Sequence, residues 1–183
     1  MQEHAELDWT MFESEVGVGV FAGGFLHVGT PELPAVLDAL AEWTFVLKPD
    51  PKRQVVARNG YGDLAFVTHD VRGHCTAGVL SLRRARVERP DSRPDLASLL
   101  DFYLPDADRN RIPGRPTVHP FLDRDVWDAV VAARGAPLAT DEAVVPIVPE
   151  PLGGRQEVSN FRVEKLADYL REVAPIYARA LAR

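Results

Sequence analysis

The sequence of 183 residues contains a single cysteine, Cys75. One thiol cannot form an internal disulfide, so we expect a hydrophobic core to hold the fold in a reducing, cytoplasmic compartment. No run of 18 uncharged apolar residues occurs, and residues 1–16 lack the basic and apolar blocks of a secretory signal. The sequence therefore predicts neither a membrane-spanning nor a secreted protein, and no membrane partner.

An excess of positive charge is also missing. Lysine and arginine together number 21 against 27 aspartates and glutamates, giving a net charge of −6. Nucleic-acid binding needs clustered basic residues, and the short strip formed by Arg83, Arg84, Arg86 and Arg89 lacks interleaved aromatics. We therefore expect no direct nucleic-acid partner and interpret the strip as a solvated strand face or as internal ion pairs. The acidic balance favours a basic partner, or it serves only solubility.

Recognisable catalytic and cofactor motifs are scarce. No serine lies in a G-x-S-x-G elbow. The segment 17–22, GVGVFA, matches the dinucleotide-binding fingerprint, but strand-like or turn-like residues follow it where that fingerprint needs a helix. His69, His74 and Cys75 lack a metal-ligand spacing, and neighbouring strand residues such as His74 and Cys75 face opposite ways. The sequence predicts no catalytic residue, no metal ligand, no cofactor and no enzyme, although an unrecognised active site stays open.

The pattern of apolar residues predicts one α+β domain over 16–183, preceded by a polar tail over 1–15. A short strand is expected near 24–28, and a β-meander of alternating runs over about 53–88, with a tight turn at Asn59-Gly60. The central sheet is therefore expected to be mainly antiparallel.

About four flanking helices are expected from apolar residues at helical spacing. The first begins at Thr30-Pro31, the second covers 96–103, and the third covers about 122–134 and ends at Gly135. The fourth begins near Asn160 and should be kinked or split by Pro175.

Three segments of the chain resemble the sequence pattern of one protein family. The segment in the last third of the chain has the densest set of matching Gly, Pro, Asp and apolar residues. Three segments take part: residues 17–43, a Gly-rich strand and then a helix ending in Trp43; residues 55–67, VVARNGYGDLAFV; and residues 134–170. The second segment resembles an R-x-x-(aromatic)-G-D-L strand–turn–strand, with matches at Arg58, Tyr61, Gly62, Asp63 and Leu64. The third segment resembles the family at Pro137, Leu138, Asp141, Glu142, Pro149, Leu152, Gly153, Gly154, Asn160, Lys165 and Leu170.

These segments are similar to the GAD-like-domain family, which includes immunity proteins of type VI secretion in bacteria. Two departures are Ala143-Val144-Val145 in place of Cys-Tyr-Gly and the presence of Pro151. The resemblance implies a protein that acts by binding, neutralising a cognate DNase-type toxin, and the matched residues are of types that build turns and core. The alternative is a non-catalytic binding or regulatory module of the same fold with an unrelated partner.

An acidic surface would suit a basic nuclease, because a nuclease cleft must attract phosphate. The longest irregular stretch, residues 104–120, contains four prolines and is expected to be an exposed loop followed by the third helix. The candidate partner contacts are acids of this loop and helix: Asp106, Asp108, Asp123, Asp125 and Asp128. Whether the chain forms a homodimer stays open, because no heptad or exposed stripe requires one.

Overall fold

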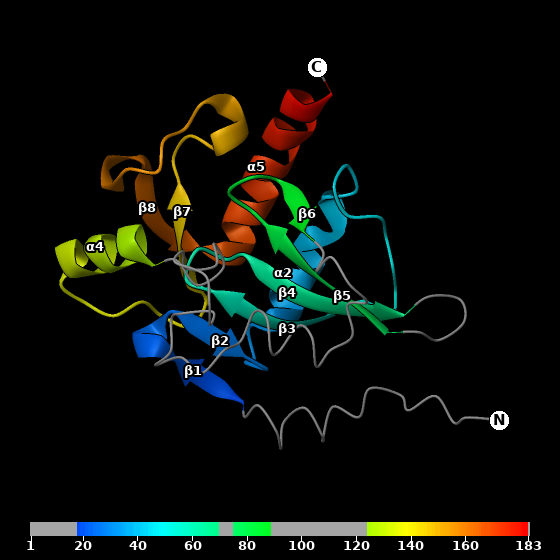
Figure 1. Ribbon diagram of the computed structural model, residues 1–183, viewed down its shortest axis with the longest axis horizontal. Coiled ribbons are helices and arrows are strands. Elements are labelled where there is room, and N and C mark those ends of the chain that lie inside the picture. The colour runs from blue at the N-terminus through cyan, green and yellow to red at the C-terminus, as the bar shows by residue number, and fades with distance from the viewer. Residues whose placement is uncertain (1–17, 70–74, 89–123, 183) are drawn as a thin grey trace, which may run out of the picture.

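Short antiparallel strands joined in chain order form the larger of two sheets (Figure 1). This architecture comes from a computed structural model, which describes residues 18–69, 75–88 and 124–182. Within these ranges the six-stranded sheet consists of β1 Gly19–Phe21, β2 Leu26–Val28, β3 Gln54–Asn59, β4 Leu64–His69, β5 Cys75–Ser81 and β6 Arg86–Glu88. The second sheet is an antiparallel ribbon of β7 Glu142–Pro146 and β8 Phe161–Lys165.

The predicted meander is confirmed, since β3 to β6 pair in sequence over 54–88. Leu64 is opposite Arg58 on one side and Leu80 on the other, and Leu80 is opposite Val87. Strands β1 and β2 extend the sheet beyond β3, because residues 19–28 form a hairpin around a single 3-10 turn. The α+β class with a mainly antiparallel sheet is thus what the chain adopts.

The main core lies between the sheet and two helices, α2 Leu33–Ala39 and α5 Leu166–Leu181. Helix α5 buries one face at helical spacing, namely Leu166, Tyr169, Leu170, Val173, Ala174 and Tyr177. Trp43 is fully buried in this core, and its indole Nε1 donates to the Leu170 carbonyl at 3.0 Å. This bond ties the chain after α2 to α5.

A second, smaller core lies beneath α4 Asp125–Arg134. It consists of Phe25, Tyr61, Trp127, Val130, Val144 and Phe161. Strand β7 separates the two cores, because Ala143 and Val145 face the main core whereas Val144 faces the second one. Both faces of β7 are buried from Ala143 onward, which explains the apolar run after Glu142.

The helices differ in detail from the expectation. Among the described residues there are three α-helices rather than about four, and the helix expected over 96–103 lies outside those residues. Helix α2 begins at Leu33, later than Thr30-Pro31, and has Pro34 in its first turn. The end of α4 agrees with the prediction, since Gly135 takes the left-handed conformation with φ 71°. None of the described helices is long and apolar enough to cross a membrane.

The last helix begins six residues later than predicted, at Leu166. Residues 161–165 form β8 instead, with Val163 opposite Val144 and Phe161 facing the second core. Pairing with β7 provides backbone hydrogen bonds for residues 161–165. The segment therefore forms a strand, although its apolar residues have the spacing of a helix. Helix α5 is continuous through Pro175, which lies on the exposed face, so the predicted split does not occur.

Candidate functional site

Arg58 joins the three segments that carry the family resemblance. The side chain is fully buried in β3, and its Nε donates to Glu32 Oε1 of the first segment at 3.2 Å. Its Nη2 donates to the Thr140 carbonyl and, at 3.3 Å, to the Glu142 carbonyl of the third segment. Its Nη1 donates to the neighbouring Asn59 carbonyl at 3.3 Å. A single guanidinium therefore fixes the start of α2, the main sheet and β7 relative to one another.

His27 completes this buried junction. Its Nδ1 lies 2.7 Å from Glu32 Oε1, and its Nε2 lies 3.2 Å from the Gly24 carbonyl oxygen and 3.3 Å from Arg58 Nη2. Burial, and then the positive charge of Arg58, lower the pKa of His27, while Glu32 opposes the shift. Burial opposes ionisation of Glu32, but hydrogen bonds and the Arg58 charge outweigh it and lower the pKa of that carboxyl. The junction thus holds an ion pair beside a histidine whose protonation is disfavoured by burial and by Arg58.

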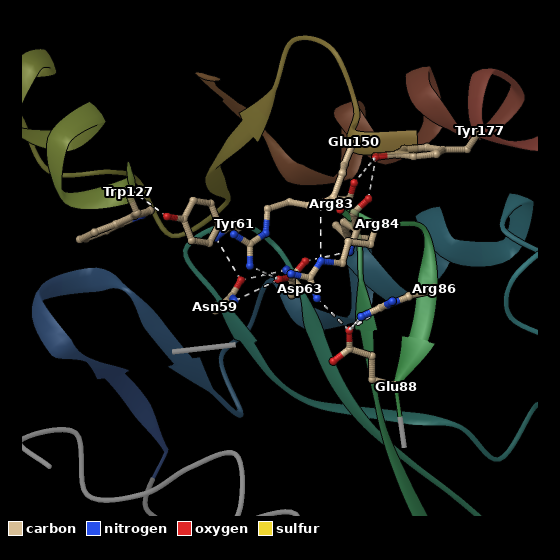
Figure 2. Close-up of polar contacts among 11 residues, drawn as sticks. Asn59, Tyr61, Asp63, Arg83, Arg84, Arg86, Glu88, Trp127, Glu150 and Tyr177 are labelled. Atoms are coloured by element: carbon tan, nitrogen blue, oxygen red, sulfur yellow. Dashed lines mark hydrogen bonds and ion pairs between the residues drawn. The ribbon is translucent and has the colours of Figure 1, made fainter. Parts of the chain in front are cut away.

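Asp63 organises a second buried network, which Figure 2 shows next to Tyr61 and Trp127. Its Oδ1 accepts from the Leu82 N–H at 2.8 Å, and its Oδ2 accepts from Arg83 Nη2 at 3.0 Å. The Arg83 guanidinium also stacks over the Tyr61 ring at 4.1 Å. The Tyr61 hydroxyl accepts from the backbone N–H of Trp127 at 2.9 Å. This network joins the β3–β4 loop to the end of β5 and to α4.

The β3–β4 loop is longer than the predicted tight turn at Asn59-Gly60. The Asn59 side-chain oxygen accepts from the N–H groups of Tyr61 and Asp63, at 3.0 and 2.9 Å, and the backbone closes between Asn59 and Asp63. Gly62 has φ +79°, and a Cβ there would lie 2.4 Å from the Leu166 side chain. The loop can be longer than a two-residue turn because the Asn59 side chain satisfies the backbone N–H groups of Tyr61 and Asp63 inside it. Leu64 follows, fully buried in the main core.

The matched positions of the third segment secure the β7–β8 ribbon. Lys165 pairs with Asp141 at 3.2 Å, and Glu142 pairs with Arg134 at 2.8 Å. The Leu166 N–H donates to the Asp141 carbonyl at 2.9 Å. The other matched positions lie before or after β7: exposed Pro137, half-buried Leu138, buried Pro149, exposed Gly153, half-buried Gly154 and half-buried Asn160. The two remaining matched positions differ, because Leu152 is exposed whereas Leu170 is buried in the main core. The interpretation of the matched set as turn and core residues stays a prediction.

The acids predicted to contact a partner are only partly described. Asp106, Asp108 and Asp123 lie outside the described residues. Asp125 and Asp128 lie exposed in the first turn of α4. Arg124 forms two hydrogen bonds with the Asp128 carboxylate, at 2.6 and 2.8 Å. Their role as contacts stays a prediction.

The basic strip at 83–86 forms internal ion pairs, as one of the two interpretations predicted. Arg83 pairs with Asp63, and Arg84 lies 3.3 Å from Glu88 and 3.5 Å from Glu150. Arg86 pairs with Glu88 at 2.8 Å. These pairs, drawn in Figure 2, occupy the arginines with carboxylates of the same chain. Arg89 lies outside the described residues.

The structure describes part of the segments that were considered for cofactor or metal binding. The glycine-rich segment from Gly19 forms β1 and a 3-10 turn and continues into β2, with no helix at the place that the dinucleotide fingerprint requires. In the described part of the chain, no three His, Cys, Asp or Glu side chains lie together in a metal-binding arrangement. His74 lies outside that part.

A pocket of about 460 Å³ lies between the start of β3 and α2. Its walls are Gly29, Thr30, Pro31, Leu33, Pro34, Leu37, Arg53, Gln54 and Val55. The lining is mostly apolar, and the Arg53 guanidinium is already engaged, donating to the Lys48 carbonyl at 2.6 Å and lying 5.4 Å from the Phe66 ring. The pocket falls within the size range of small-molecule sites, and its polar lining residues are Thr30, Arg53 and Gln54.

Sequence reasoning missed one surface feature, the connection of residues 147–160 between β7 and β8. Its apolar residues Ile147, Val148, Leu152 and Val158 are exposed. The available signal was the presence of these residues in a segment rich in Pro and Gly, without the spacing of a helix or an alternating strand. These four residues belong to neither of the two cores.

No protein-family model and no curated protein matches this sequence. Among solved structures, the chain is similar to the crystal structure of Atu4351 from Agrobacterium tumefaciens, with a TM-score of 0.55 and 15% identical residues. The similarity covers 93% of this chain and 76% of that chain. At this level of identity the likeness concerns the fold alone, and the chain therefore shares an α+β architecture with Atu4351.

Proposed function

We propose that this chain is a cytoplasmic, non-catalytic immunity-type protein that binds a cognate protein toxin and neutralises it by occlusion. The toxin is a basic nuclease, delivered between bacteria by type VI secretion. The proposal rests on the resemblance to GAD-like-domain proteins.

One structural observation supports this proposal above the others. The three resembling segments, which are far apart in sequence, meet at the buried Arg58 side chain. Because these segments contact the same buried side chain, their matches are expected to reflect one shared fold and not three unrelated sequence similarities. The second network, around Asp63, likewise joins a matched loop to β5 and α4.

The chemistry of these two networks also favours binding over catalysis. Arg58, Asn59 and Asp63 are at most 2% exposed, and their partners belong to this chain. Side chains so enclosed hold elements together and offer no reacting group to a substrate. Function is then expected to lie on the exposed surface, as for a protein that occludes another.

Co-expression with the product of the adjacent gene tests the proposal. We expect a stable complex in gel filtration and rescue of cells from the growth arrest that the neighbour causes alone. As a control, a folded protein of similar size and net charge should give neither. Binding without rescue would favour the regulatory or binding module, and absence of both would contradict the proposed function.

A further inference from the structure

The imidazole of His27 lies between a hydrogen-bond donor and a hydrogen-bond acceptor inside the Arg58 junction. His27 belongs to β2 and is 3% exposed. Its Nε2 lies 3.3 Å from Arg58 Nη2 and 3.2 Å from the carbonyl oxygen of Gly24, in the turn between β1 and β2. A guanidinium only donates and a carbonyl only accepts, so Nε2 bonds Arg58 through a lone pair or Gly24 through a proton. The same atom therefore has a different partner in each protonation state.

The other ring nitrogen keeps its partner in both states. Nδ1 lies 2.7 Å from Oε1 of Glu32, the residue before α2. Although burial opposes the shift, hydrogen bonds and the charge of Arg58 lower the pKa of Glu32, so its carboxylate is ionised near neutral pH and only accepts. Nδ1 therefore carries a proton, and the neutral ring has its lone pair on Nε2. Adding a proton converts Nε2 from an acceptor for Arg58 into a donor to Gly24.

The groups around the ring have opposite effects on its charge. Burial and the positive charge of Arg58 disfavour protonation and lower the pKa of His27, whereas Glu32 and the Gly24 carbonyl favour protonation. Strand β1, which pairs with β2 on the side away from β3, contains no titratable residue. Asp141, before β7, acts on Arg58. The ring is thus the titratable group on which the charges of this junction converge.

The start of α2 depends on this junction. Helix α2 has only seven residues, and a helix of this length is marginal without tertiary contacts. The Glu32 carboxylate connects this end of α2 to His27 at 2.7 Å and to Arg58 Nε at 3.2 Å. The Val36 N–H donates to the Glu32 carbonyl at 3.3 Å, so hydrogen exchange of that amide reports on the first turn.

We propose that His27 is an acid-sensitive latch that controls how firmly the Arg58 junction holds the start of α2. In the neutral state Nε2 accepts from Arg58. After protonation Nε2 donates to the Gly24 carbonyl instead, and two like charges then lie about 3.3 Å apart beside one carboxylate, that of Glu32. Arg58 keeps its carbonyl partners next to β7 and releases Glu32, so the first turn of α2 loosens. The latch belongs to the fold and does not depend on the proposed function.

NMR spectroscopy of the isotope-labelled full chain at about pH 7.5 and about pH 5 tests the latch. We expect the His27 ring to have an unprotonated Nε2 at the higher pH and protons on both nitrogens at the lower pH. Protection of the Val36 N–H against exchange, corrected for the intrinsic effect of pH, should fall at least about fivefold between them. The Leu82 N–H, which donates to Asp63 at 2.8 Å in the second network, should change less than about twofold.

Two variants separate the latch from other histidines. His27→Gln cannot titrate, so the protection of Val36 should differ by less than about twofold between the two pH values. His69→Gln is the matched control, because His69 lies at the end of β4 away from Leu64, the residue opposite Arg58. This control should keep the fall seen in the wild type. The ring titration of the wild type decides the protonation states even where a variant fails to fold.

Three outcomes overturn the inference. The first is a proton on Nε2 at the higher pH, which would mean that Arg58 has no acceptor there to lose. The second is a ring that stays neutral at the lower pH. The third is a protonated ring with unchanged protection of Val36, or with an equal fall at Val36 and Leu82, since an equal fall indicates loss of global stability and not release of α2.

Discussion

Replacing Arg58 by alanine should be among the most damaging substitutions in this protein. The guanidinium is fully buried and donates to Glu32 and to the carbonyls of Asn59, Thr140 and Glu142. Alanine leaves the mostly buried Glu32 carboxylate without its cation and removes the guanidinium donor from the Thr140 and Glu142 carbonyls, whereas the Asn59 carbonyl still accepts the Gly62 N–H. Removing one partner of a buried ion pair costs about 3–5 kcal/mol of unfolding free energy, because the remaining charge stays desolvated.

Urea unfolding followed by circular dichroism measures this loss. With an m-value of about 2 kcal/mol per molar urea, a loss of 4 kcal/mol lowers the midpoint by about 2 M. Adding Glu32→Gln to Arg58→Ala should recover part of the loss, since the stranded charge is then gone.

Arg86→Ala is the matched control. Arg86 also pairs with a glutamate, at 2.8 Å, but it is largely exposed, and an exposed pair contributes about 0–1 kcal/mol. If Arg58→Ala lowers the midpoint no more than Arg86→Ala does, the assignment of Arg58 as the junction of the three segments is wrong.

Three further predictions concern other parts of the fold. Because the pKa of His27 is lowered below 6.5 in the folded protein, the unfolded chain takes up the proton first, so stability is full above pH 6.5 and falls as pH drops below it. His27→Gln should flatten this fall in urea midpoints measured on both sides of pH 6.5, and an unchanged slope would contradict the lowered pKa of His27. Gly154→Ala should cost about 1–3 kcal/mol in thermal unfolding, because the backbone near Val148 must move, and an unaffected midpoint would mean that the connection is loosely held. Tyr177→Phe should cost about 1 kcal/mol in urea unfolding, since its hydroxyl donates to the Leu82 carbonyl at 2.7 Å, and no loss would show that this bond contributes nothing net.

Local patterns predicted the elements whose spacing and boundary residues agree with their tertiary environment. The meander over 54–88 followed from alternating runs and turn residues, and the end of α4 followed from Gly135. The buried face of α5 followed from apolar residues at helical spacing. The start of α5 did not, because residues 161–165 pair with β7, and pairing with a distant strand is invisible in a single-sequence pattern.

In the candidate site, too, the sequence identified some residues, whereas only the structure showed their partners. The sequence identified Arg58, Tyr61 and Asp63 as matched positions of a structural kind, and the structure places each of them in a buried network. It did not identify Glu32 or His27 as partners of Arg58, nor Asn59 as the cap of its own loop. Partners from other segments become known only when the chain folds, because hydrogen bonding depends on distance in space.

The sequence by itself determined the α+β class, the antiparallel meander and the positions of most turns, since spacing, glycine and proline act locally. Only the tertiary structure decided that Arg58 lies at the meeting point of three segments and that β7 is buried on both faces. It also decided which apolar residues stay in water. Ile147 and Leu152 are as apolar as the core residues, and they remain exposed because the hydrogen bonds of Asn160 and the close packing of Gly154 fix their connection away from both cores.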